Sequence, residues 1–61
     1  MDFPPLGQAD AFANIGKVYA SQGKKYDALE FLGNACTIYQ KMGIVTKLQD
    51  AEELIEQLNA M

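Results

Sequence analysis

Apolar residues recur at helical spacing in three stretches of this 61-residue sequence, and a glycine separates each stretch from the next. In the first stretch they fall at i, i+3, i+4 and i+7, the spacing that places side chains on one face of an α-helix. Gly23 and Gly43 stand where helices commonly end in a left-handed glycine cap. The sequence therefore predicts an all-α fold with helices over residues 8–22, Lys25–Met42 and residues 46–59.

Before the first of these helices, residues 1–8 are expected to form an N-terminal arm. Pro4, Pro5 and Gly7 fit either a short extended segment or the first turn of a helix, in which proline is favoured at the first position. The pattern leaves both alternatives open.

The apolar residues of the second predicted helix cover about half of its circumference, which is wider than one packing partner requires. This helix should therefore have two neighbours. Its apolar positions are Ala28, Leu29, Phe31, Leu32, Ala35, Cys36, Ile38, Tyr39 and Met42.

The third predicted helix is amphipathic. Thr46 and Gln49 have the spacing of a capping box, in which the two side chains bond to each other's backbone N–H groups. Its apolar stripe consists of Ile44, Leu48, Ala51, Ile55 and Leu58. The opposite face carries Gln49, Glu53, Glu56 and Gln57, as expected of a surface that meets water.

Aromatic and small residues in the first two predicted helices form a recognisable pattern. The sequence reads Phe12-x₂-Ile15-Gly16-x₂-Tyr19, followed by Ala28-x₃-Leu32. It resembles the tetratricopeptide repeat, a helix–turn–helix unit of about 34 residues, over residues 9–42. The chain departs from the family pattern at Gln40, where proline is usual, and at Tyr26, which follows the turn glycine by one residue more than usual.

Gly16 and Ala28 have almost no side chain, so two helices can approach closely where these residues face each other. Glycine inside a helix costs about 0.5–1 kcal/mol relative to alanine, so Gly16 should have a packing reason. We expect Phe12, Tyr19 and Leu32 to fill the space on either side of this contact.

The resemblance implies a function as well as a fold. It implies one domain over residues 1–61, an antiparallel hairpin closed by a capping helix over residues 44–60, and a protein or peptide partner bound on the first helix. The implied binding residues are Asp10, Ala13, Asn14, Lys17 and Ser21. Asn14 and Lys17 lie three positions apart on one helical face and could jointly hold a carbonyl or carboxylate group. The alternative is that both are simply solvated.

A chain of 61 residues buries only about 60% of its unfolded surface, so a thin core is expected. Repeats of this kind usually need about three copies, since each buries its apolar face on the next. We therefore expect a homo-oligomer. The alternatives are a monomeric three-helix bundle, a structural bundle that self-assembles without an external ligand, and the C-terminal fragment of a longer repeat array.

The charge and residue composition of the chain argue against several classes of function. A net charge of −3 with no arginine argues against binding to nucleic acid or to an anionic membrane. Residues 1–5 lack the features of a signal peptide, and we expect a cytoplasmic protein. Without histidine, and with Cys36 as the single cysteine, the sequence offers no internal disulfide, zinc site or catalytic pair. We expect a non-enzyme without cofactor or metal, in which Cys36 is a small buried thiol.

Overall fold

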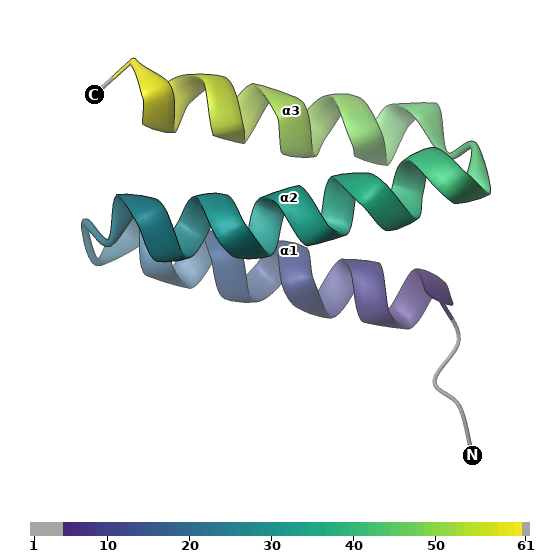
Figure 1. Ribbon diagram of the computed structural model, residues 1–61, viewed down its shortest axis with the longest axis horizontal. Coiled ribbons are helices and arrows are strands. Elements are labelled where there is room, and N and C mark those ends of the chain that lie inside the picture. Colours follow the sequence, from purple (N-terminus) through teal and green to yellow (C-terminus); the bar gives the residue numbers. More distant parts are fainter. Residues whose placement is uncertain (1–4, 61) are drawn as a thin grey trace.

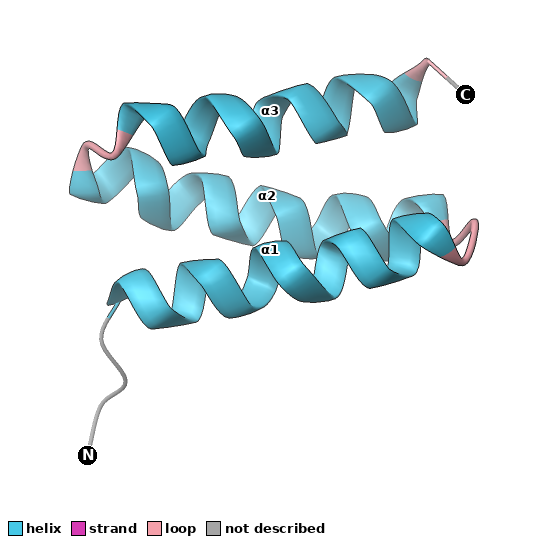
Figure 2. Ribbon diagram, turned by 180° about the vertical axis from the view of Figure 1, so that it is seen from behind, coloured by secondary structure: helices cyan, strands magenta, loops and turns pink. Residues whose placement is uncertain are grey.

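The computed structural model describes residues 5–60 and arranges them as three antiparallel helices, α1 (Pro5–Ser21), α2 (Lys25–Met42) and α3 (Val45–Asn59). Helix α2 packs against α1 on one side and against α3 on the other (Figure 1). Seen from behind, α1 and α3 both lie in front of α2 (Figure 2). The predicted all-α hairpin with a third helix is confirmed, and so are the two neighbours of the second helix.

The boundaries of α2 match the prediction, whereas α1 begins earlier than expected. Pro5 is the first residue of α1, so residues 5–8 belong to the helix and not to the expected arm. Of the two alternatives that the sequence left open, the first helical turn beginning with a proline is the one observed for these residues. Proline is well suited to this position because its missing N–H group would have no partner within the helix. Residues 1–4, the rest of the predicted arm, lie outside the described part of the chain.

The predicted capping box at the start of α3 is wrong. Ile44 is the N-cap residue, and no side chain bonds to the free N–H groups there. The backbone N–H of Leu48 already donates to the Ile44 carbonyl at 3.0 Å, so the helix starts one residue before the expected site. Thr46 therefore lies inside the first turn, where its side chain cannot act as the cap.

Both turns between helices are closed by the same pair of backbone hydrogen bonds. In the first turn Gly23 donates to the carbonyl of Ala20 at 3.1 Å, and Lys24 donates to the carbonyl of Tyr19 at 2.9 Å. This is the Schellman arrangement, which needs a residue with positive φ after the helix. Gly23 has a φ of 78°, and the second turn repeats the arrangement at Gly43 with a φ of 70°. Both predicted glycine caps are confirmed.

Helices α1 and α2 approach each other closely at Gly16, which is buried. A Cβ atom at this position would lie 2.7 Å from Cγ of Leu32 and 3.3 Å from the carbonyl oxygen of Ala28. No side chain fits without displacing Leu32, so the predicted packing reason for Gly16 is confirmed.

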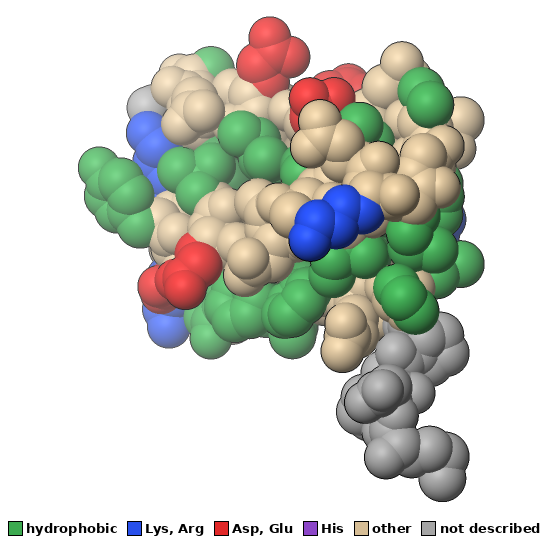
Figure 3. Space-filling model, turned by 45° about the vertical axis from the view of Figure 1, so that its right-hand side comes forward, with side chains coloured by type: hydrophobic (Ala, Val, Ile, Leu, Met, Phe, Trp, Pro, Cys, Tyr) green, Lys and Arg blue, Asp and Glu red, His purple; other side chains and the backbone are tan. Residues whose placement is uncertain are grey.

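Three aromatic rings lie beside this contact and form what we call the aromatic cluster: Phe12, Tyr19 and Phe31. The ring of Phe31 lies 5.5 Å from that of Tyr19 and 6.1 Å from that of Phe12, between centroids. Next to the cluster Ile15 is 40% exposed and Val18 is 55% exposed. Apolar side chains gather along the lower part of Figure 3, over α1 and the adjoining side of α2.

Small side chains dominate the core. Most of the buried apolar residues are alanines, and Leu32 is the largest side chain that is fully buried. Cys36 packs against this core but is only half-buried, so the expectation of a buried thiol is met in part. The buried apolar residues are Ala9, Ala13, Ala28, Leu32, Ala35, Tyr39, Ala51 and Leu58. Within residues 5–60, no helix has both the length and the hydropathy needed to span a membrane.

Candidate functional site

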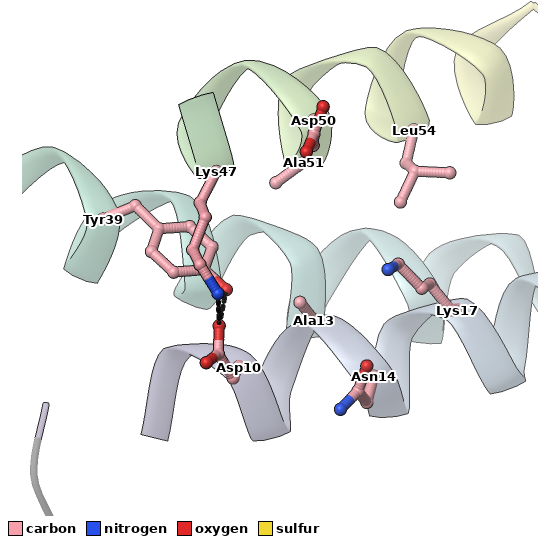
Figure 4. Close-up of a pocket in the computed structure, with 9 residues that line it drawn as sticks. All are labelled: Asp10, Ala13, Asn14, Lys17, Tyr39, Lys47, Asp50, Ala51 and Leu54. Carbon is pink, nitrogen blue, oxygen red and sulfur yellow. Dashed lines mark hydrogen bonds and ion pairs between the residues drawn. The ribbon is translucent and has the colours of Figure 1, made fainter. Parts of the chain in front are cut away.

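A groove of about 380 Å³ lies between α1 and α3, with Tyr39 of α2 at its floor (Figure 4). The groove exists because α1 and α3 both pack on α2 and make few contacts with each other. Small side chains on the facing sides of the two helices keep it open. Its lining residues are Asp10, Ala13, Asn14 and Lys17 of α1, Tyr39 of α2, and Lys47, Asp50, Ala51 and Leu54 of α3.

The structure brings four of the five sequence-predicted binding residues together in this groove: Asp10, Ala13, Asn14 and Lys17. Ser21 is not among the lining residues. It is the last residue of α1, and its hydroxyl group donates to the carbonyl of Val18 at 2.7 Å. Ser21 therefore supports the end of its own helix, apart from the groove.

Asp10 joins all three helices at one end of the groove. The hydroxyl group of Tyr39 donates to Oδ1 of Asp10 at 2.5 Å, and Nζ of Lys47 donates to the same oxygen at 3.0 Å. We call these three residues the Asp10 junction. The hydrogen bond from Tyr39, followed by that from Lys47, lowers the pKa of Asp10 below its ordinary value of 3.8. Asp10 is therefore an anion at neutral pH.

Tyr39 is 3% exposed, and its ring packs in the core while its hydroxyl group reaches Asp10. Burial, and then the hydrogen bond to Asp10, raises the pKa of Tyr39 to about 12. The hydroxyl group therefore keeps its proton at neutral pH and acts as a fixed donor.

The other end of the groove is open and carries groups of both signs. Asn14 and Lys17 of α1 are exposed there, opposite Asp50 of α3. A shallower hollow shares Lys17, Asp50 and Leu54 with the groove and extends it toward Glu53 and Gln57. Amide and ammonium donors thus face carboxylate acceptors beside the small side chains of Ala13 and Ala51, an arrangement that can bind polar main-chain groups.

A second hollow beside α2 contains Cys36 together with Glu52 and Ile55. Burial and the nearby Glu52 carboxylate raise the pKa of the Cys36 thiol, which keeps it protonated and a poor nucleophile. Among residues 5–60 no three side chains of the metal-binding types come together to hold an ion.

The sequence alone did not identify the residues that face α1 across the groove, above all Tyr39 and Lys47. A tyrosine in a buried stripe signals that its hydroxyl group needs a partner. The partner, Asp10, lies 29 positions earlier in the chain, and only the packing of α1 on α2 reveals it. Nothing in the spacing of Lys47 indicates that it reaches the same carboxylate.

No protein-family model, curated protein or solved structure matches the chain.

Proposed function

We propose that the protein is an interaction module that binds a peptide segment of a partner protein in the groove between α1 and α3. The observation that carries this proposal is the convergence of Asn14, Lys17 and Asp50 around one open end of the groove. A peptide backbone offers carbonyl acceptors and N–H donors in alternation. The amide and ammonium groups can bind the former, and the carboxylate can bind the latter.

We also propose that the chain is a single tetratricopeptide-like repeat with a capping helix. The tight contact at Gly16 supports this proposal, because the matched glycine is the position where the helices meet. The exposed polar face of α3 also supports it, since a terminal repeat needs an outer surface that tolerates water.

The test is a selection of peptides from a displayed library on the immobilised protein, followed by affinity measurements on variants. The double substitution Asn14→Ala with Lys17→Ala should weaken the selected peptides by at least about tenfold, as expected for two contact residues in a small site. The control is Asn34→Ala with Lys41→Ala, which removes the same two residue types from exposed positions on α2 outside the groove. Equal affinity for both double variants would rule out the groove as the binding site.

Self-association without an external ligand is the second candidate function. It is favoured by the exposure of Ile15 and Val18, which lie beside the aromatic cluster on a side of α1 where that helix carries no charged residue. A copy of the chain could cover Ile15 and Val18 without burying a charge of α1, whereas the ammonium group of Lys24 lies over the ring of Tyr19, 5.5 Å from its centroid. Sedimentation over a hundredfold range of concentration tests the idea, because Val18→Glu should abolish any dimer while leaving the helix content unchanged.

A further inference from the structure

We propose that Asp10 sets the ligand chemistry of the groove: it excludes acidic groups from the Tyr39 and Lys47 end and accepts a hydrogen bond from a ligand N–H or ammonium group there. This inference rests on the proposed peptide-binding function. It names the kind of peptide group that each end of the groove takes.

The first step concerns the two donors of the Asp10 junction. A tyrosine hydroxyl and a lysine ammonium group pointing at one spot would ordinarily attract a ligand carboxylate. Both donors are instead directed at Oδ1 of Asp10, at 2.5 and 3.0 Å. An incoming ligand carboxylate has to displace the Asp10 carboxylate, which the fold holds in place. Because Asp10 belongs to the same molecule, it competes at an effective concentration of about millimolar or higher. Asp10 therefore neutralises the charge of Lys47 and competes with acidic ligands for it.

The second step concerns the other oxygen of Asp10. Both hydrogen bonds converge on Oδ1, and within residues 5–60 no donor reaches Oδ2. The Asp10 side chain is 39% exposed, and its second oxygen points away from Tyr39 and Lys47 in Figure 4. A carboxylate can accept several hydrogen bonds, so Oδ2 remains available to a ligand donor.

The third step is the spacing of the two ends. Asp10 and Lys17 are seven residues apart on α1, which corresponds to about 10 Å along the helix axis. An extended peptide covers that length with about three residues. The groove therefore fits a short peptide segment whose donor group lies at Asp10 and whose carbonyl or carboxylate group lies at Asn14 and Lys17.

Two small probes separate the ends: trialanine amide, which has a free ammonium group, and N-acetyl-trialanine, which has a free carboxylate. Each is titrated at low salt into isotope-labelled protein while the backbone amide signals of the groove residues are followed by NMR. In the unmodified protein the ammonium probe should bind about three- to fivefold more tightly, the range expected for a partly exposed charge pair. It should shift the Asp10 signals, whereas the carboxylate probe should shift those of Asn14 and Lys17 only.

The decisive variant is Asp10→Asn, which keeps an oxygen acceptor for Tyr39 and Lys47 and removes the negative charge. The preference for the ammonium probe should vanish or reverse, and the carboxylate probe should then shift the Lys47 signal. The matched control is Asp27→Asn, which makes the same charge change at an exposed site on α2 outside the groove. It should preserve the preference to within about twofold, because Asp27 lines neither end of the groove. Circular dichroism checks that both variants keep their helix content.

The possible failures are distinguishable. If both probes bind and Asp10→Asn leaves their ratio unchanged, Asp10 does not set the ligand chemistry, although the groove still binds peptides. If Asp27→Asn removes the preference equally, the cause is the overall charge of the protein, and the role given to Asp10 is wrong. If neither probe shifts the groove signals in any of the three proteins, the peptide-binding proposal fails and this inference fails with it.

Discussion

The two sides of the contact between α1 and α2 are built differently. On one side the rings of the aromatic cluster pack beside the small residues. On the other side α3 stands away from α1, and the Asp10 junction spans the remaining space. Close approach at Gly16 forces large side chains to lie beside the contact, where either rings or a third helix can cover it. We infer that the packed side stabilises the fold and that the open side is free to bind.

If the packed contact provides the stability, the largest loss should follow truncation of its central side chain. Leu32→Ala should lower the free energy of unfolding by about 3 kcal/mol, the cost of a cavity at a fully buried leucine. Leu54→Ala is the matched control, because Leu54 is a half-buried leucine on the groove wall and should cost about 1 kcal/mol. Urea denaturation followed by circular dichroism gives both values. Equal losses would break the distinction between the two sides.

Substitutions at two helical glycines should change the free energy of unfolding by smaller amounts and in opposite directions. Gly16→Ala should destabilise by about 1–2 kcal/mol, because the new Cβ would meet Leu32 at 2.7 Å and the overpacking outweighs the gain in helix propensity. Gly33→Ala should stabilise by about 0.5–1 kcal/mol, since nothing lies within 4 Å of its added Cβ. Thermal or urea unfolding measures both substitutions.

Combining Gly16→Ala with Leu32→Ala tests whether contact with Leu32 is the reason why an alanine at position 16 destabilises the fold. In a Leu32→Ala background the obstructing side chain is gone, so Gly16→Ala should cost much less than in the unmodified protein, and the two changes should not be additive. Additive losses would show that Leu32 is not the reason for glycine at this position.

The packed side was largely predictable from the sequence. Helical spacing and the two turn glycines placed α2 at its observed ends, and the pairing of Gly16 with Ala28 followed from the absence of side chains at both positions. These features depend on local backbone geometry and on residue size, which are properties of neighbouring residues in the sequence. The start of α3 was predicted wrongly because Thr46 matched a capping pattern. In the structure, Ile44 directly follows Gly43 in the Schellman turn and is the N-cap residue of α3.

The groove could be predicted on one wall only. Asp10, Asn14 and Lys17 share a face of α1, and the resemblance to a known repeat selected that face. The opposite wall depends on the angle at which α3 leaves α2, which no residue pattern in the sequence specifies. The Asp10 junction could not be predicted from the sequence either, because its three side chains come from three helices whose packing brings them together.

Removing one hydroxyl group from the junction tests how much the open side contributes to stability. Tyr39→Phe should cost about 1 kcal/mol near neutral pH, the typical value of one hydrogen bond. The folded state raises the pKa of Tyr39 from 10.0 to about 12, so the stabilisation is complete below pH 10 and is lost as the pH rises toward 12. The difference in unfolding free energy between the two proteins should therefore shrink over that interval. A constant difference would mean that the hydroxyl group is not held as the structure shows.

The smallest effect is expected for Lys47→Gln. Lys47 and Asp10 are 44% and 39% exposed, and an ion pair in contact with water contributes little to stability. Unfolding should barely change, and Lys41→Gln, at an exposed site outside the groove, should give a similar value. The two variants should differ in binding instead: only Lys47→Gln removes the positive charge that faces Asp10, which leaves the Asp10 carboxylate without its counter-charge and more attractive to a ligand ammonium group. Tighter binding of trialanine amide to Lys47→Gln than to Lys41→Gln would place the role of Lys47 in ligand choice. A clear loss of stability in Lys47→Gln relative to Lys41→Gln would instead show that the ion pair stabilises the fold, and the distinction between a packed side and an open side would then be wrong.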